Sequence, residues 1–311
     1  STLRGDRKIN FNAYVRVGGH FVLYCRKGDS FEGERLKKLK KKKLEKLWID
    51  REERKLYDHY ITSNIEEAFD LSKKKDVLSR TQVLEGYLES LSADIIEDPA
   101  DAAQYANAIT SCGRLIEFIQ KENLALKCLL SFDNPNASIT QHGVNVAAIS
   151  LALADKLGMV EENIENVKLL GVGALIHDVG HLHTSIDIKQ PVSSFNEADL
   201  KIYQSHPQNA IEVLRRLKHI DTTVLNIVLE HEEHIDGSGF PRGLQQREID
   251  PASLVVGVVN YFDRLVSFQN THPIDALKEM LIDKMGQLPL DHMKSMQELL
   301  LERQCLTRAT R

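Results

Sequence analysis

The stretch LIHDVGHLHT, Leu175 to Thr184, places three histidines and an aspartate within seven consecutive positions, directly behind an apolar segment. Such an apolar lead-in predicts a buried helix whose C-terminal end presents His177 and Asp178. Imidazole nitrogens and carboxylate oxygens are both ligands for divalent metals. The stretch therefore indicates a metal site at the end of a core helix, to which other segments have to contribute.

Three further segments each carry a histidine near the end of a predicted helix. These are His142, His206 before a proline, and His231, which Glu232 follows directly. A single histidine in an apolar helix is more often a core residue than a ligand. Four helices that each deliver an imidazole at one end, two of them with an adjacent carboxylate, favour a shared metal site instead.

The ligand types also indicate the metal and its chemistry. Mixed imidazole and carboxylate ligation, without a nearby cysteine, suits iron, manganese or zinc. Asp178 has two oxygens and can bridge two metals, an arrangement that activates water and clamps a phosphoryl group. Phosphoester hydrolysis is the chemistry that these residues best serve.

Helical patterning dominates the chain around these residues. Beyond the loop FDNPNAS, residues 132–138, several segments of 10 to 20 residues carry apolar side chains at helical spacing, and strand patterning is nearly absent. The region from residue 133 to residue 311 therefore reads as an all-α bundle. Before it, residues 63–132 read as a helical connector, a signalling or dimerisation stalk, which Pro99 interrupts.

The first sixty residues differ from the rest. Apolar and polar residues alternate from Ile9 to Val17, Gly18-Gly19 follows, and a β-rich run extends from Phe21 to Cys25, which together predict a hairpin. The run LKKLKKKKLEKL, residues 36–47, is interpreted as a solvated face of an amphipathic helix rather than a nucleic-acid site. Residues 1–62 are thus expected to form a small α+β domain.

Composition narrows the function classes. The formal net charge of -5 gives no reason to expect DNA binding, and no apolar run approaches the roughly 20 residues that span a membrane. The four cysteines are scattered and have no paired spacing, which is typical of free thiols in a reducing compartment. A cytoplasmic location is expected.

The order of the histidines, followed by DGSGFPRGL at Asp236 to Leu244, resembles the HD-GYP family of bacterial cyclic di-GMP phosphodiesterases over about residues 138 to 270. The resemblance implies a mainly α protein, an HD-type helical bundle with the small N-terminal α+β domain attached. It implies two divalent metal ions, with iron expected first and manganese or zinc as alternatives. It assigns metal roles to seven residues, with Asp178 as the bridge and as a catalytic residue: His142, His177, Asp178, His206, His231, Glu232 and Asn260.

Several positions depart from the family pattern. Glu232 stands where a second histidine is common, and Asn260 stands where the family has a metal-binding aspartate, with Asp263 one helical turn later as the alternative ligand. Some members hold a third metal through a glutamate that is Ser138 here, so a binuclear site is expected. His183 is expected to be a bystander.

The substrate side departs as well. His181 replaces the family lysine that faces the substrate phosphate, and Phe240 replaces the GYP tyrosine. A histidine can donate a hydrogen bond to phosphate, but its positive charge is conditional on pH. His181 is therefore the candidate phosphate contact or proton donor, and the substrate-binding set expected from the resemblance is His181, Gly239, Phe240 and Pro241.

Three hypotheses follow. The first is hydrolysis of cyclic di-GMP by the binuclear centre, and the second is hydrolysis of another nucleotide phosphoester by the same centre. The third is a degenerate domain that binds metal and cyclic di-GMP, or a protein partner, without turnover. The resemblance also implies diguanylate cyclases or other signalling proteins as partners, and a homodimer is a further expectation.

Overall fold

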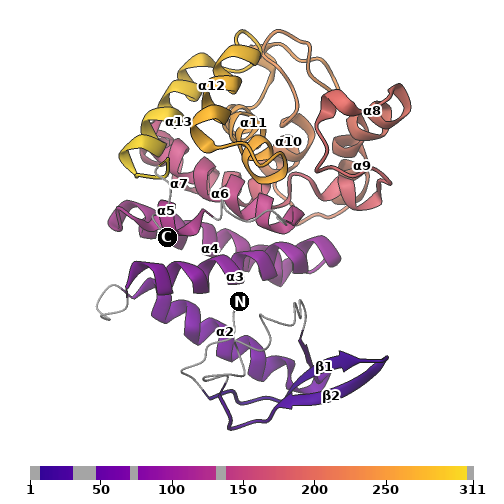
Figure 1. Ribbon diagram of the computed structural model, residues 1–311, viewed down its shortest axis with the longest axis vertical. Helices are drawn as coiled ribbons and strands as arrows, with labels where there is room; N and C mark the ends of the chain where they lie inside the picture. Colours follow the sequence, from indigo (N-terminus) through magenta and orange to yellow (C-terminus); the bar gives the residue numbers. More distant parts are fainter. Residues whose placement is uncertain (1–7, 31–46, 71–75, 131–137, 307–311) are drawn as a thin grey trace. The chain divides into compact units, whose positions relative to one another are not determined.

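The structure, a computed structural model, describes residues 8–30, 47–70, 76–130 and 138–306 (Figure 1). The chain packs as two compact units, residues 1–87 and residues 88–311. Among the described residues, no helix combines the length and the apolar composition that a membrane crossing requires. Among the described residues, helices make up most of the second unit and strands occur in the first, as the sequence predicts.

The first unit contains a three-stranded antiparallel sheet and a helix. Strands β1 (Ala13–Val17) and β2 (His20–Cys25) form the predicted hairpin, and β3 (Trp48–Ile49) pairs with the other edge of β1. Gly18 and Gly19 join β1 to β2 at positive φ, 57° and 86°, which glycine adopts without steric cost.

Aromatic residues hold this unit together. Phe11 is fully buried and meets the rings of Tyr57 and Tyr60 edge-on, at centroid distances of 5.4 and 5.6 Å. Both tyrosines belong to α2 (Arg54–Phe69), which follows the 3-10 turn η1 (Arg51–Glu53). The segment before β1 is therefore packed on α2, and the α+β character expected for this part is confirmed. Most of the lysine-rich run lies outside the described residues.

The second unit is helical. Helix α3 (Val77–Glu97) crosses the boundary between the units. The longer helices that follow are α4 (Ala102–Lys121), α5 (Ala125–Leu129), α6 (Ile139–Lys156), α7 (Met159–Ile176), α8 (Glu197–Gln204), α9 (His206–Leu214), α10 (Thr222–Glu230), α11 (Pro251–Asp263), α12 (Pro273–Asp283) and α13 (Leu290–Glu302). Short helical turns connect them: η2 (Val179–His183), η3 (Val192–Ser194), η4 (Gln246–Glu248) and η5 (Arg264–Phe268).

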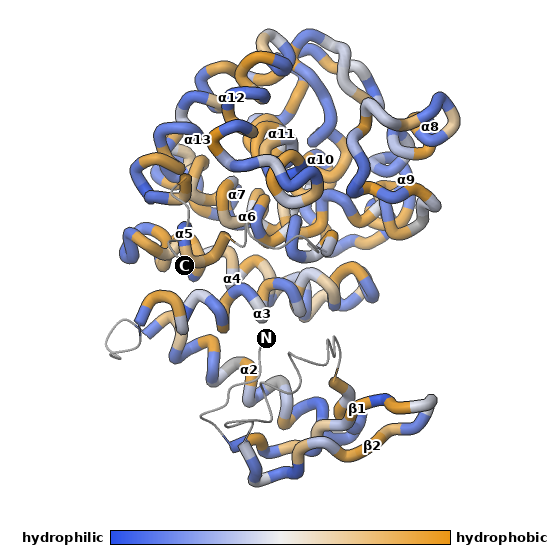
Figure 2. The backbone as a smooth tube through the Cα atoms, in the orientation of Figure 1, coloured by the Kyte–Doolittle hydropathy of each residue, from blue (hydrophilic) through white to orange (hydrophobic). Residues whose placement is uncertain are grey.

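Helix α6 is the centre of the second unit. Every residue from Gln141 to Ala154 is buried, because α4, α5, α7, α11 and α13 all pack against it. A helix covered on all sides has to be apolar around its whole circumference, apart from side chains with a specific polar partner. Figure 2 shows α10 and α11 as mainly hydrophobic, whereas α12 and α13 alternate between hydrophobic and hydrophilic residues. The inner helices thus form the scaffold for the polar residues that they carry.

Two glycines let the elements that carry the histidines approach closely. A Cβ on Gly143 would lie 2.5 Å from the Leu175 carbonyl oxygen, so this glycine brings α6 against the end of α7. A Cβ on Gly180 would lie 1.9 Å from the His206 carbonyl oxygen, so η2 can touch α9 only without a side chain there. Both contacts place histidines from different helices side by side.

The predicted three-part division, with boundaries after residues 62 and 132, stays a prediction. The loop expected at the second boundary lies almost wholly within residues 131–137, outside the described residues. Helices α4 and α5, which belong to the predicted connector, pack on α6 within the second unit. Pro99 lies between α3 and α4, as the sequence predicts.

Candidate metal centre

Four buried histidines and one aspartate converge inside the second unit. His142 lies in the first turn of α6, His177 caps the end of α7, and Asp178 follows it directly. His206 begins α9, and His231 caps the end of α10. All five side chains are almost completely buried. Buried polar side chains are costly unless hydrogen bonds or a bound ion satisfy them.

The Nδ1 atom of each histidine faces an oxygen acceptor. His142 Nδ1 lies 2.7 Å from Asp263 Oδ2, and His177 Nδ1 lies 2.8 Å from the Ala174 carbonyl oxygen. For His206 and His231 the acceptors are backbone carbonyls, including Tyr203 O at 2.7 Å and Val228 O at 3.1 Å. Because a carbonyl or carboxylate oxygen only accepts, each Nδ1 carries the proton and each Nε2 is left with a lone pair.

The four Nε2 atoms surround Asp178 in two pairs. Those of His142 and His177 each lie 3.6 Å from Asp178 Oδ2. Those of His206 and His231 each lie 3.5 Å from Asp178 Oδ1. The cluster therefore contains two sets of three potential metal ligands that share the aspartate, one set at each carboxylate oxygen.

These residues fit a pair of divalent cations. Neither oxygen of Asp178 has a hydrogen-bond partner in the described part of the chain, although both are buried. The Nε2 lone pairs face each other at 3.2 Å between His142 and His177 and at 3.0 Å between His206 and His231. A cation at each pair would satisfy both lone pairs and one carboxylate oxygen. Mixed imidazole and carboxylate ligation of this kind suits iron, manganese and zinc.

The charges in the cluster also favour metal binding. Burial lowers the pKa of His177 to about 3 and holds the pKa of His206 well below its usual value. Burial alone would raise the pKa of Asp178, but the surrounding imidazoles, His177 foremost, outweigh it and keep that pKa well below the ordinary range. His231 differs, since the Asp178 and Glu232 carboxylates overcome burial and raise its pKa. At neutral pH the cluster therefore offers an ionised bridge and mostly neutral imidazoles, the forms that bind metals.

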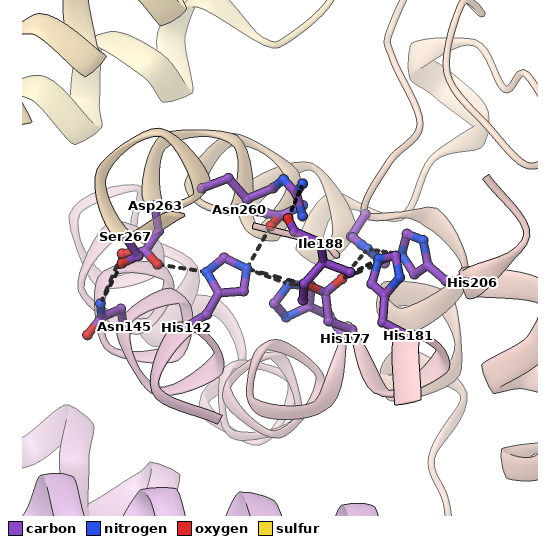
Figure 3. Close-up of polar contacts among 12 residues, drawn as sticks. His142, Asn145, His177, His181, Ile188, His206, Asn260, Asp263 and Ser267 are labelled. Atoms are coloured by element: carbon purple, nitrogen blue, oxygen red, sulfur yellow. Dashed lines mark hydrogen bonds and ion pairs between the residues drawn. The ribbon is translucent and has the colours of Figure 1, made fainter. Parts of the chain in front are cut away.

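Asn260 and Asp263 take opposite sides of His142 (Figure 3). Asn260 Oδ1 lies 3.0 Å from His142 Nε2, on the side of the cluster, whereas Asp263 accepts from Nδ1 on the far side. The other oxygen of Asp263 accepts from Asn145 Nδ2 at 3.1 Å. Asn260 thus stands where a further ligand would be, and Asp263 orients the ring, as carboxylates commonly do for metal-binding histidines.

Glu232 lies at the edge of the cluster and joins neither set of three ligands. Its Oε1 accepts from the Tyr203 hydroxyl at 2.5 Å and from Asn260 Nδ2 at 3.3 Å. Tyr203 is itself buried, and burial raises its pKa well above the usual value, so its hydroxyl stays protonated as a donor. In this arrangement Glu232 links the tyrosine to the amide that faces His142.

His181 lies inside the cluster, and neither of its ring nitrogens has a hydrogen-bond partner among the described residues. Its ring stacks on His206 at 3.8 Å between centroids, and its Nε2 lies 3.9 Å from Asp178 Oδ1. Burial lowers the pKa of His181 to about 4, so the ring is neutral at neutral pH. It can donate a hydrogen bond, but it does not supply the permanent charge of a lysine. The side chain of His183 lies outside what the structure describes.

The glycine-rich loop brings Phe240 to the cluster. The ring of Phe240 meets Tyr203 and His206 edge-on, at 5.7 and 6.2 Å between centroids. Gly237 and Gly243 have positive φ, 80° and 65°, which glycine adopts without steric cost, whereas Gly239 does not. Gly239 is needed for space, because a Cβ there would lie 2.2 Å from the backbone nitrogen of His234. Pro241, expected beside the substrate, continues the same loop.

Two buried glutamates, which no sequence pattern singles out, hold this loop. Glu233 accepts from the backbone nitrogens of Arg242 at 2.7 Å and Leu244 at 2.9 Å. Glu230 pairs with the Arg242 guanidinium and accepts from the Asp250 nitrogen at 2.8 Å. From the sequence alone, a carboxylate this close to His231 could bind a metal or could hold the loop. No sequence signal separates these two roles.

Comparison with known proteins identifies the helical part of the chain. A family model described as HD domain matches residues 124–291. The chain is 31% identical over 141 residues to a Vibrio cholerae protein named 3'3'-cGAMP-specific phosphodiesterase 1, 27% identical over 143 residues to the cyclic di-GMP phosphodiesterase PA4108 of Pseudomonas aeruginosa, and 30% identical over 139 residues to a cyclic di-GMP phosphodiesterase of Thermotoga maritima.

These matches cover 45%, 46% and 43% of the chain and 32%, 34% and 37% of the respective relatives. The chain thus spans about a third of the length of these curated relatives. A solved structure matches almost throughout: Bd1817, an HDG"Y"P protein from Bdellovibrio bacteriovorus, is 38% identical, with a TM-score of 0.85 over 96% of this chain and 97% of that one. Both the helical region and the N-terminal part therefore have a counterpart in one known fold.

Proposed function

Because the chain belongs to the HD domain family, in its HD-GYP group, we propose that it is a metal-dependent phosphodiesterase that hydrolyses cyclic di-GMP at a binuclear centre. The observation that carries the proposal is the position of Asp178, whose two oxygens each face a separate pair of Nε2 lone pairs. Relatives named cyclic di-GMP phosphodiesterases support the substrate class.

The residues of the chain would divide the work as follows. His142 and His177 would hold one cation, His206 and His231 would hold the other, and Asp178 would supply one carboxylate oxygen to each. Asn260 is the further ligand proposed on the His142 side, in preference to Asp263, because its oxygen faces the Nε2 atom. When bound, two divalent cations stabilise charge on the phosphoryl oxygens and activate a water for in-line attack. Iron is proposed first, with manganese or zinc as alternatives.

The neighbouring side chains would orient the substrate. His181 reaches the cluster as a neutral imidazole and can donate a hydrogen bond to a phosphoryl oxygen or to the leaving oxygen. Phe240 presents an aromatic ring, held by the loop anchored on Glu233, against which a base can pack. Glu232 is proposed to tune the site through Tyr203 and Asn260, and it remains the candidate for direct ligation once a metal is present.

A hydrolysis assay tests the proposal. Protein loaded with iron or manganese should convert cyclic di-GMP to the linear dinucleotide or GMP, and Asp178→Ala should abolish turnover. Wild-type protein with full metal content that binds cyclic di-GMP without cleaving it would overturn the enzymatic proposal and support a receptor instead. The same assay with 3'3'-cGAMP tests the second candidate, which the similarity to the Vibrio cholerae enzyme favours.

A further inference from the structure

Arg264 is a buried arginine beside the candidate metal centre, and it has no role in the function proposed above. It follows Asp263 and opens the π-helical turn η5, and its side chain is almost completely buried, with 6% of the residue exposed. Its Nη2 donates to the Ile188 carbonyl oxygen at 3.1 Å, and its guanidinium lies over the ring of Tyr203, 5.1 Å from the centroid. Short π-helical turns inside helices occur frequently at functional sites.

The charge of Arg264 has no carboxylate partner among the described residues. Its Nη1 is buried and has no hydrogen-bond partner there, whereas Arg242, in the same unit, pairs directly with Glu230. Burying an unpaired cation is costly, and a stack on an aromatic ring offsets only part of that cost. An anionic ligand that accepts a hydrogen bond from Nη1 would therefore satisfy this N–H group and balance the buried charge.

Its position indicates where such an anion would lie. The Tyr203 ring under the guanidinium also contacts His206, at 5.4 Å, and His181, at 5.3 Å, between centroids. Asn260, which faces the cluster, is four residues before Arg264 and thus on the same helical face. An anion that Nη1 binds from this side would also lie near the cations that the histidines would hold.

We propose that Arg264 binds a phosphoryl oxygen of the substrate or product through Nη1 and so supplies a fixed positive charge beside the candidate metal centre. Its Nη2 is held by the Ile188 carbonyl and its plane by Tyr203, so the guanidinium is oriented before the ligand arrives. The inference rests on the proposed function for the identity of the substrate, but phosphate binding itself requires no turnover.

Arg264→Met tests this role, because methionine keeps an apolar stem against Tyr203 and removes the charge. Calorimetry on metal-loaded protein, with inorganic phosphate as the probe, should show a loss of affinity on the order of tenfold to a hundredfold. Elemental analysis should show unchanged metal content. Arg303→Met is the matched control, because Arg303 also donates to a backbone carbonyl, Ile119 O at 3.2 Å, and lies in the same unit. It should leave the affinity for phosphate unchanged.

Melting temperatures keep the test decisive. Since an unpaired buried charge destabilises the free protein, Arg264→Met should melt at the same or a higher temperature than wild type without phosphate. It should also lose most of the additional stability that phosphate gives to wild type. A variant that melts earlier but retains its own phosphate-induced shift would show a structural arginine and overturn the proposal.

The outcome is independent of the proposed activity. If wild type cleaves no cyclic dinucleotide but its affinity for phosphate depends on Arg264, the proposed function fails and the inference stands. If wild type cleaves the dinucleotide and Arg264→Met binds phosphate as tightly as wild type, the inference alone fails.

Discussion

At the scale of single residues, each histidine of the candidate metal centre is held by the nitrogen that points away from Asp178. The acceptors of His177, His206 and His231 are backbone carbonyls three or four residues earlier in the chain, whereas the acceptor of His142 is the Asp263 carboxylate. A charged acceptor makes a stronger hydrogen bond than a carbonyl and raises the basicity of the opposite nitrogen. His142 therefore depends on a distant side chain, whereas the other three depend on local backbone.

Asp263→Asn should weaken one metal position and spare the other. The amide can present its NH₂ group to His142 and no longer fixes the ring as a donor at Nδ1, so affinity at the His142–His177 pair should fall roughly 10- to 100-fold. Among the described residues Asp263 contacts His142 and Asn145 and makes no contact with the His206–His231 pair, which should keep its metal. Metal titration followed by elemental analysis would show this as loss of about half of the bound metal. Equal loss from both positions would contradict the orienting role.

The sequence indicates the identity of the ligands better than their roles. His177-Asp178 and the three separate histidines could be predicted, because histidines at helix ends beside a carboxylate are a recognisable pattern. The choice between Asn260 and Asp263 could not, since it depends on which nitrogen of His142 each side chain faces. Arg264 gives no signal in the sequence either, because a buried unpaired cation is visible only once its surroundings are known.

At the scale of elements, the site depends on how closely η2 approaches α9. The Gly180 Cα lies so near the His206 carbonyl that any side chain would force the two elements apart. Since His206 must reach Asp178 Oδ1, which is two residues before Gly180, this contact sets the distance between a ligand and the bridge. Gly180 is thus required for the close approach of η2 to α9, which its position between His177 and His181 in the sequence does not reveal.

Gly180→Ala should separate His206 from Asp178 and reduce metal at the His206–His231 pair. The overpacking should also cost about 1–3 kcal/mol of unfolding free energy. Gly286→Ala is the control, because Gly286 has φ 82° and open space around it. Alanine in this left-handed backbone conformation should cost about 1–2 kcal/mol of unfolding free energy, and the metal content should not change. Denaturant unfolding and elemental analysis would check both variants, and full metal content in Gly180→Ala would refute the spacing argument.

The elements themselves could largely be predicted. Apolar residues at helical spacing account for α6, α7, α10 and α11, and the Gly18-Gly19 pair accounts for the hairpin, because both signals are local. The reason for Gly239 could not be predicted, since its close contact is with the His234 backbone across a folded loop. The packing of α4 on α6 and α7 is likewise a tertiary contact, and it brings part of the expected connector into the helical unit.

At the scale of the whole molecule, the buried histidines make stability depend on pH when no metal is bound. Burial lowers the pKa of His177 to about 3, that of His181 to about 4 and that of His206 well below its usual value. The unfolded chain takes up protons on these residues near pH 6.5, and the folded chain does not. Stability is therefore lost as pH falls from about 6.5 toward the folded values. The raised pKa of His231 has the opposite effect on stability, but it belongs to one residue, whereas three residues have a lowered pKa.

Chelator-treated protein should accordingly melt at a lower temperature at about pH 5 than at about pH 7. His177→Gln should show a smaller decrease, because one of the three histidines is gone. Bound metal should raise the melting temperature at neutral pH, since a ligand of the folded state stabilises it. A melting temperature that is constant or rises on acidification of the metal-free protein would contradict the neutral, proton-poor cluster described above.

The most direct test of the central claim is the metal content per chain of the purified protein. If Asp178 bridges two cations, wild type should bind two divalent ions, His142→Gln and His206→Gln should each retain one, and Asp178→Asn should lose tight binding of both. A wild-type protein that saturates with a single ion, or an Asp178→Asn variant that retains two, would contradict the account.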